Sequence, residues 1–340
     1  MPGLISELKN AFDNVENPWF PKYQNMIHLR AEAMLTNRLP QILDAVSYFR
    51  ARFSHNRPEY VFTGPNQHTI SRAASYAALA LDIPVYDFLI LASTHHPRYR
   101  HPVAKYAYIY DPWYRDIFED YMRMPADKIR VSGPLFDYGK RLSHTPASNK
   151  TLKNKTHIVF FSQSGNFQNS CNMLEGIIKG SKKHDDIYIT VKMHPHESPA
   201  NLKHYENFAA QLGVTDNINL IHQGDAVALI NEADLVVQSF SNVGLDALLM
   251  KTPVITYKPP SNLKARIFLY EKDIGHVVKT KAALAKKVSK FLSDPQDKLK
   301  MQEIANNFAK ENDHFLRSDN AERVMAEVLN DIGKSPKSPT

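Results

Sequence analysis

The sequence predicts an α/β protein made of two Rossmann-like domains, each with a parallel sheet. Short runs of β-branched and aromatic residues alternate with amphipathic helical patterns, and this alternation occurs twice along the chain. A polar, basic stretch without periodicity, residues 139–156, separates the two series. Because strands separated by helices form βαβ units with right-handed crossovers, the pattern favours two parallel sheets. The length of 340 residues agrees with roughly two domains.

The composition is that of a globular protein. With 43% hydrophobic and 23% charged residues, a disordered chain, a coiled coil and a collagen-like fibre are excluded. Glycine is scarce, at 12 residues, or about 3.5% against a usual value near 7%, so glycine-rich phosphate loops are not expected. The net charge of +7 suits an anionic substrate or an anionic membrane surface, and it equally suits a basic protein with no specific anionic partner. It does not by itself indicate nucleic acid.

The single cysteine and the hydropathy pattern bear on the compartment. Cys171 alone excludes an internal disulfide framework and a cysteine-built zinc site, and it suits a reducing compartment. The N-terminus lacks the apolar core of a signal peptide. The best apolar stretch, residues 77–92, is interrupted by Asp82, Pro84 and Asp87 and is shorter than the roughly 20 residues of a membrane span. We therefore expect a cytoplasmic protein, with peripheral contact to the inner face of the membrane as a further option.

The first domain is expected to span residues 1–140. Its predicted strands are residues 59–63, 85–91, 106–110 and 129–132. Its predicted helices are residues 27–53, 68–81 and 112–121. Pro40 should start, kink or split the first of these helices, whereas Pro112 falls in a first turn, where proline is tolerated. Because no strand is predicted in residues 1–26, this domain is short, and we expect either a minimal member of its fold or part of a larger protein.

The second domain is expected to span residues 157–332, after a linker at residues 141–156. Its predicted strands are residues 157–162, 187–193, 218–221, 234–238 and 253–257. Its predicted helices are residues 170–182, 200–212, 226–232, 243–250, 281–292, 297–311 and 320–332. The tail, residues 333–340, is rich in Ser, Pro and Lys and is predicted to be disordered.

Three polar segments follow predicted strands of the second domain, at the edge where parallel α/β sheets bind their ligands. The first contains Lys192, His194 and Pro195. A histidine held by a following proline at a strand end can donate a hydrogen bond to a phosphate oxygen, and Lys192 can add positive charge. The alternative is a strand that ends at a proline and leaves its histidine exposed.

The second segment places Ser239, Ser241 and Asn242 at the start of a predicted helix. Hydroxyl and amide groups at a helix N-terminus, together with free backbone N–H groups, favour an anion. Simple capping of the helix by Ser241 or Asn242 is the alternative, and it uses the same geometry.

The third segment, Ser162-Gln163-Ser164-Gly165-Asn166, comes at the end of the first strand of the second domain. Small polar side chains and a glycine allow close approach of the backbone to a ligand. A loop of this composition is common, so the segment carries weight only together with the other two.

A polar loop in the first domain, residues 93–102, contains His95, His96, His101, Arg98 and Arg100. A zinc site is not expected, because no further ligands stand at a suitable spacing. A histidine that acts in catalysis or contacts phosphate is one interpretation, and a solvated basic loop is the other. The dinucleotide, Walker A and Gly-x-Ser-x-Gly patterns are absent, which argues against a dinucleotide dehydrogenase, a P-loop NTPase and an α/β-hydrolase.

The order of the motifs resembles a known family. Lys192-x-His194-Pro195 is followed, one α–β–α–β step later, by Ser239-Phe240-Ser241. This resembles the nucleotide-binding half of GT-B glycosyltransferases that build bacterial surface polysaccharides and carry an HP motif and a serine motif. These include bacterial sialyltransferases and Kdo transferases that use CMP-sugars, and the CDP-glycerol glycerophosphotransferases. The resemblance implies that His194, Ser239 and Ser241, with Asn242 beside them, contact the donor's phosphate and nucleotide in an inter-domain cleft.

The first domain also resembles the acceptor domain of this group, in which the loop after a strand often reads His-Gly and carries a histidine near the reaction centre. This sequence has His95-His96-Pro97 instead. The resemblance implies that His95 or His96 is catalytic, and which of the two stays open. The acidic motif of the sialyltransferases is absent, which argues against that branch.

The resemblance implies an inverting, metal-independent transferase that needs no cofactor. It would move a sugar or polyol phosphate from a nucleotide-activated donor, CMP or CDP favoured and UDP as an option, to a polysaccharide or lipid-linked acceptor. Nucleic acid is not an expected partner. Two alternatives remain open: an enzyme similar to UDP-GlcNAc 2-epimerases, and a non-catalytic GT-B scaffold that binds a nucleotide or glycan.

Overall fold

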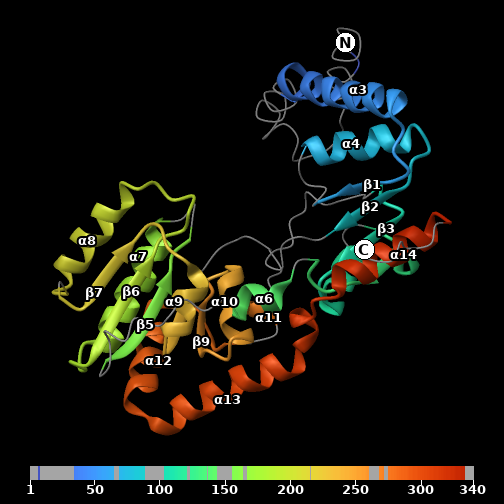
Figure 1. Cartoon of the computed structure of the whole chain (residues 1–340). Helices are drawn as coiled ribbons and strands as arrows, with labels where there is room; N and C mark the ends of the chain where they lie inside the picture. Colours follow the sequence, from blue (N-terminus) through green and yellow to red (C-terminus); the bar gives the residue numbers. More distant parts are fainter. Residues whose placement is uncertain are drawn as a thin grey trace, which may run out of the picture. The chain divides into compact units, whose positions relative to one another are not determined.

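The chain folds into two compact units, each built on its own parallel sheet (Figure 1). The computed structural model describes residues 7, 34–64, 69–88, 103–120, 123–135, 137–143, 155–163, 167–214, 216–259, 268–271 and 275–333. One unit holds a four-stranded sheet and the other a six-stranded sheet. The predicted fold class, two parallel-sheet α/β domains, is therefore confirmed.

The first unit has the sheet order β1-β2-β3-β4. The strands are β1 (Val61–Thr63), β2 (Val85–Phe88), β3 (Tyr106–Ile109) and β4 (Ile129–Val131). The helical segments of residues 34–128 are η1 (Met34–Arg38), α3 (Leu39–His55), α4 (Thr69–Leu79), η3 (Pro112–Tyr114), α5 (Arg115–Asp120) and η4 (Ala126–Lys128). Of these, η3 and the start of α5 belong to the second unit. Pro40 lies in the first turn of α3, so it starts this helix, one of its three predicted effects. The small residues Ala73, Ala74, Ala77 and Ala78 of α4 are buried, and α4 lies between α3 and the sheet (Figure 1).

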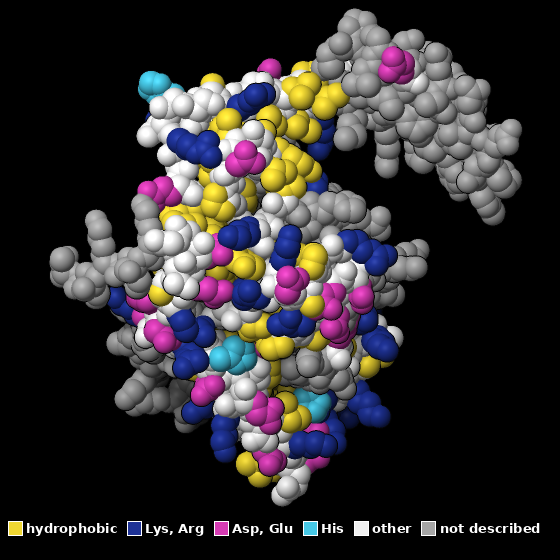
Figure 2. All heavy atoms as spheres, turned by 90° about the vertical axis from the view of Figure 1, so that its right-hand side faces the viewer, with side chains coloured by type: hydrophobic (Ala, Val, Ile, Leu, Met, Phe, Trp, Pro, Cys, Tyr) yellow, Lys and Arg dark blue, Asp and Glu magenta, His cyan; other side chains and the backbone are white. Residues whose placement is uncertain are grey.

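Exposed apolar side chains concentrate on α3 and α4. Five of the eight large hydrophobic residues exposed in the described part of the chain belong to these two helices: Leu43, Tyr48, Ile70, Tyr76 and Leu79. Figure 2 shows basic and acidic side chains interspersed on the face it presents, so the positive charge does not form one patch there. None of the described helices has both the length and the apolar composition needed to cross a bilayer.

The second unit has the sheet order β10-β9-β8-β5-β6-β7, with parallel neighbours throughout. The strands are β5 (Thr156–Phe161), β6 (Ile187–Lys192), β7 (Ile218–Ile221), β8 (Leu235–Gln238), β9 (Val254–Tyr257) and β10 (Val277–Val278). Every residue of β8 and β9 is buried, as expected for central parallel strands covered by helices on both faces. The strand order reverses between β5 and β8, which defines the topological switch point of the sheet.

The helices of the second unit agree with the sequence prediction within a few residues, apart from three short ones. They are α6 (Tyr138–Ser143), α7 (Phe167–Ser181), α8 (Asn201–Gln211), α9 (Ala226–Glu232), α10 (Asn242–Leu249), α11 (Phe268–Glu271), α12 (Lys281–Ser293), α13 (Pro295–Glu311), η6 (Asp313–Leu316) and α14 (Asn320–Asp331). The sequence did not indicate α6, α11, η6 or strand β10. Helix α6 begins at Tyr138 and covers the first five residues of the stretch 139–156, for which the sequence predicts no regular structure. Predictions for residues 27–33, 89–91, 121, 144–154 and 334–340 lie outside the described residues.

Helix α7 packs closely against the sheet and against α12. Its buried face includes Cys171, Leu174 and Ile177, which join the main hydrophobic cluster of this unit. Burial raises the pKa of the Cys171 thiol to about 11. Gly176 and Gly180 lie where α7 contacts α12, and a β-carbon at either position would clash with α12. Two of the few glycines in the chain therefore allow these helices to pack closely.

We expect Gly180→Ala to destabilise the protein by about 1–3 kcal/mol, although alanine ordinarily stabilises a helix interior. A β-carbon at Gly180 would lie 2.6 Å from the backbone oxygen of Ala285 and 2.8 Å from Cβ of Val288, neither of which can rotate away. At Gly176 the nearest atom is Cδ2 of Leu284, the end of a flexible side chain, so Gly176→Ala should cost less. Urea denaturation of both variants measures the difference, and a Gly180→Ala variant as stable as the parent would contradict this packing.

Candidate functional site

The candidate site lies at the carboxyl edge of the six-stranded sheet, around the switch point between β5 and β8. Open α/β sheets bind ligands in the crevice at this position. The loops after β5, β6 and β8 contain the three polar segments singled out in the sequence, so the topology brings them to one edge. Two of them touch directly, because the backbone N–H of His194 donates to Oγ of Ser162 at 3.0 Å.

Glu197 fixes the turn that follows His194. Its buried carboxylate accepts hydrogen bonds from the hydroxyl of Ser162, from Tyr205 at 3.2 Å and from Nδ2 of Asn201 at 3.4 Å. Its backbone oxygen lies 3.1 Å from Nε2 of His222, which follows β7. One side chain therefore links the loops after β5 and β6 with helix α8, and its backbone reaches the loop after β7.

His194 is held as a neutral hydrogen-bond donor. The backbone N–H of His196 donates to its Nδ1 at 3.1 Å, so the proton of the neutral ring resides on Nε2. Burial, followed by the neighbouring His196, lowers the pKa of His194 below its ordinary value, and the nearby Glu197 opposes this shift. At neutral pH the ring therefore offers an uncharged Nε2–H.

Lys192 turns its ammonium group inward. The side chain is buried, and Nζ donates to the backbone oxygens of Met193 at 2.8 Å and His222 at 2.9 Å. Burial lowers the pKa of Lys192. Two of the three N–H donors thus connect the ends of β6 and β7, and the donor contact expected of Lys192 stays a prediction. Pro195, the next predicted residue, lies exposed in the turn.

Gln238 and Ser241 shape the loop after β8. Oε1 of the buried Gln238 accepts from the backbone N–H of Ser241 at 2.9 Å, and its Nε2 donates to Oγ1 of Thr256 at 2.8 Å. The hydroxyl of Ser241 accepts from the backbone N–H of Val243 at 3.4 Å and caps α10. The capping interpretation of Ser241 is therefore confirmed, and its contact with a phosphate stays a prediction.

The hydroxyl of Ser239 faces the neighbouring strand. It is buried and lies 2.8 Å from the backbone oxygen of Tyr257 and 2.9 Å from the hydroxyl of Tyr270 on α11. Because Ser239 connects β8 with β9 and α11, its side chain helps to fix the loop between β8 and α10. The contact of Ser239 with the donor stays a prediction.

Two buried polar atoms beside the switch point have no hydrogen-bond partner in the part of the chain that the structure describes. They are Nε2 of Gln163, directly after β5, and Oδ1 of Asn242, the first residue of α10. Gln163 is only 6% exposed. Unpaired buried polar atoms are rare in native proteins, since each costs roughly 1–3 kcal/mol. One donor and one acceptor in these positions are what a bound polar ligand would satisfy.

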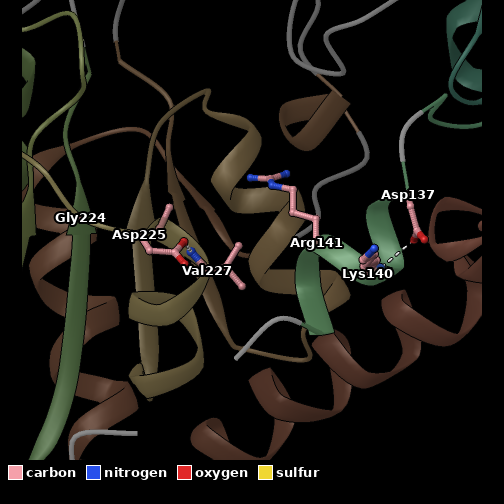
Figure 3. Close-up of a pocket in the computed structure, with 7 residues that line it drawn as sticks. Asp137, Lys140, Arg141, Gly224, Asp225 and Val227 are labelled. Atoms are coloured by element: carbon pink, nitrogen blue, oxygen red, sulfur yellow. Dashed lines mark hydrogen bonds between the residues drawn. The ribbon is translucent and has the colours of Figure 1, made fainter. Parts of the chain in front are cut away.

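A pocket of about 590 Å³ opens between helix α6 and the start of α9 (Figure 3). Asp137, Lys140 and Arg141 form one wall, and residues 224–227 form the other. Asp225 accepts from the backbone N–H of Val227 at 2.9 Å and caps α9. The pocket thus places two cationic side chains opposite a carboxylate at the same edge of the sheet.

Asp246 anchors the α6 wall of this pocket. It is fully buried on α10, where it accepts a hydrogen bond from the hydroxyl of Tyr138 and an ion pair of 2.8 Å from Nη2 of Arg141. Burial raises the pKa of Asp246 to about 7, whereas the bonds from Arg141 and Tyr138 favour its charged form. Sequence reasoning missed these residues, although a single carboxylate in the apolar run Val243–Met250 signals a buried polar partner.

The remaining predicted site residues, His95, His96, Ser164 and Gly165, lie outside the described residues, so their roles stay predictions. In the part of the chain that the structure describes, no group of three or more His, Cys, Asp or Glu side chains is arranged to hold a metal ion. Glu197, Arg141 and Asp246 are the functional candidates that the structure adds.

Comparison with known proteins shows that the chain shares its fold with GT-B proteins. Residues 151–261 match the family described as capsule polysaccharide biosynthesis protein. No curated protein matches the sequence at a significant level. Three similar solved structures show how far the fold agrees.

UDP-GlcNAc 2-epimerase from Neisseria meningitidis, bound to UDP-GlcNAc, has a TM-score of 0.60 and 15% identity, covering 85% of this chain and 81% of its own. A glycosyltransferase from Rickettsia africae has a TM-score of 0.61 and 15% identity, covering 88% of this chain and 84% of its own. HepE from Anabaena, in complex with UDP-glucose, has a TM-score of 0.60 and 12% identity, covering 84% of this chain and 82% of its own. The chain therefore has the GT-B fold, and the part of it that carries the candidate site is similar to capsule polysaccharide biosynthesis proteins.

Proposed function

We propose that the protein is a GT-B transferase that takes a sugar or polyol phosphate from a nucleotide-activated donor during capsule or other surface-polysaccharide synthesis. The main support is the pair of unpartnered polar atoms of Gln163 and Asn242, which flank the switch point. The neutral donor His194 belongs to the same edge of the sheet. All three residues fall within the segment that matches the capsule family.

In the proposed reaction the donor phosphate lies at the N-terminus of α10. The acceptor oxygen bonds to the transferred group while the bond from that group to the nucleotide phosphate breaks, with inversion. His95 or His96 accepts the proton of the acceptor hydroxyl. The Nε2–H of His194 donates to the departing phosphate as its negative charge develops. No metal ion or cofactor is required in this scheme.

The resemblance and the fold neighbours support two donor classes. The HP and serine motifs favour CMP- or CDP-linked donors, as in CDP-glycerol glycerophosphotransferases. UDP is the second option, because HepE from Anabaena is described with UDP-glucose. The acceptor is a polysaccharide or a lipid-linked glycan. Exposed apolar residues of α3, with Arg50 and Arg52 on the same helix, support peripheral contact with an anionic membrane.

A second candidate is an enzyme similar to UDP-GlcNAc 2-epimerases, which is favoured by the fold of the Neisseria protein. The segment Phe240-Ser241-Asn242 argues against an epimerase, because such epimerases usually have glycines directly after the serine that corresponds to Ser239. A third is a scaffold that binds a nucleotide or glycan without catalysis.

A thermal-shift panel with CMP, CDP, UDP and GDP tests the proposal. A nucleotide present at about 100 times its Kd should raise Tm by roughly 5–10 °C, because it binds only the native state. A response to CMP or CDP, followed by transfer from the matching donor to a glycan acceptor, is the expected result. Epimerisation of UDP-GlcNAc without acceptor would favour the second candidate, and binding without transfer the third. No response to any nucleotide would contradict the proposal.

A further inference from the structure

The proposed leaving group calls for a positive charge close to the N-terminus of α10. A departing nucleotide carries at least one phosphate whose charge grows as the bond breaks. His194 is held as a neutral donor, and Lys192 directs its ammonium group to two backbone oxygens. A further cationic side chain at the same edge of the sheet would supply this charge.

Arg141 has the required exposure and free donors. It lines the pocket between α6 and α9, and its side chain is 42% exposed. Of its five N–H donors, only one nitrogen, Nη2, is used, in the ion pair with Asp246. The other donors of Arg141 have no partner among the described residues. A guanidinium group with this arrangement can bind a phosphate through two parallel hydrogen bonds.

The guanidinium group of Arg141 is also held in place. Asp246 on α10 forms the ion pair with the guanidinium group. The guanidinium group also lies over the ring of Tyr138, with Cζ of Arg141 5.4 Å from the ring centre. Helix α6 is fixed on its other side as well, because a β-carbon at Gly139 would lie 2.7 Å from the backbone oxygen of Leu316 in η6. Such support reduces the entropy lost when the side chain binds a ligand.

The position of Asp246 places Arg141 near the start of α10. Asp246 follows Asn242 by four residues, which corresponds to about 6 Å along a helix axis. The ion pair with Arg141 therefore lies one turn from the helix N-terminus, where the unpartnered Oδ1 of Asn242 is found. A nucleotide phosphate at this N-terminus is within reach of a long arginine side chain.

We propose that Arg141 binds the phosphate of the nucleotide-activated donor, and that Asp246 is the positioning residue that orients it. The inference rests on the proposed function and names the group that recognises its anionic part. In this arrangement the α6 wall of the pocket binds the donor, and the ring of Tyr138 packs against the guanidinium group of Arg141.

The test compares the affinity of Arg141 variants for nucleotides with and without phosphate. We measure binding of CDP, CMP, UDP, cytidine and uridine by calorimetry. Arg141→Met should raise the Kd of the nucleotide that the parent binds by about 10- to 100-fold and leave the Kd of the matching nucleoside within about threefold. Arg141→Lys should have a nucleotide Kd between those of the parent and Arg141→Met, because lysine keeps the charge but lacks the planar guanidinium group. Inorganic pyrophosphate should displace the nucleotide from the parent and fail to do so from Arg141→Met.

Two further variants separate binding from folding and from general charge. Arg141→Met leaves Asp246 buried without its cation, so the double variant Arg141→Met/Asp246→Asn provides a folded alternative with the same expected loss of affinity. Asp246→Asn alone should weaken nucleotide binding by roughly fivefold, again without affecting the nucleoside. Lys140→Met removes the same charge from the same wall, and we expect a loss of at most about threefold.

The outcomes distinguish the inference from the function on which it rests. If the parent binds a nucleotide and both Arg141→Met and the double variant bind it equally well, the assignment of Arg141 is wrong and the proposed function stands. If Lys140→Met weakens binding as much as Arg141→Met, a general electrostatic effect replaces the specific one. A parent protein that binds none of the three nucleotides contradicts both proposals.

Discussion

Replacing His194 by alanine is expected to lower kcat/KM for transfer by about 100-fold or more while Tm stays within about 2 °C of the parent value. The substitution removes the Nε2–H that would donate to the departing phosphate. The ring is only partly buried, and the turn itself is held by the backbone N–H of His194 and by Glu197, both of which remain. Steady-state kinetics with the donor identified in the nucleotide panel measures the effect.

Two variants control for the loss of an imidazole. His196→Ala removes the exposed neighbouring ring but keeps the backbone N–H that fixes Nδ1 of His194, so its kcat/KM should stay within about threefold. His194→Gln offers an amide N–H in a similar position and should recover part of the activity. Unchanged activity of His194→Ala with every donor that the parent accepts would remove this histidine from the mechanism.

The largest effect on stability is expected for Glu197→Ala, which should lower the free energy of unfolding by about 3–5 kcal/mol. The variant leaves the buried hydroxyls of Ser162 and Tyr205 without their acceptor. It also releases the turn after His194, so activity should fall together with stability. Urea denaturation followed by circular dichroism measures the change.

Glu206→Ala is the matched control for this prediction. Glu206 lies on α8 and forms an ion pair with Lys203 at 3.0 Å, and its side chain is 43% exposed. Its removal should change the free energy of unfolding by less than about 0.5 kcal/mol. Glu197→Gln keeps the shape and one acceptor, so we expect an intermediate loss. A Glu197→Ala variant as stable as Glu206→Ala would show that this carboxylate does not support the turn.

The regular elements of the second unit could be predicted from the sequence because their patterns are local. Buried strands such as β8 appear as short apolar runs, and helices such as α12 show an apolar face. Helix α6 could not be predicted in this way. It has six residues, and it is held by Arg141 and Tyr138, whose common partner Asp246 lies more than 100 positions further along the chain.

The edge that holds the candidate site could also be predicted, since residues after parallel strands meet there. The direction of each side chain could not. The ammonium group of Lys192, for example, donates to the backbone oxygen of His222, 30 residues further along the chain. Ser239 meets the backbone of Tyr257 across the sheet. Such pairings depend on how neighbouring strands align, which no local pattern reveals.

The burial of Cys171 makes the protein suited to site-specific thiol labelling. Its side chain is 5% exposed, and with a pKa of about 11 only on the order of one thiol in ten thousand is ionised at neutral pH. Because the sequence holds one cysteine, a second one introduced on the surface would react almost alone with a maleimide dye. A fluorophore near Asp137, for example, would then report on α6 without any change to the native thiol.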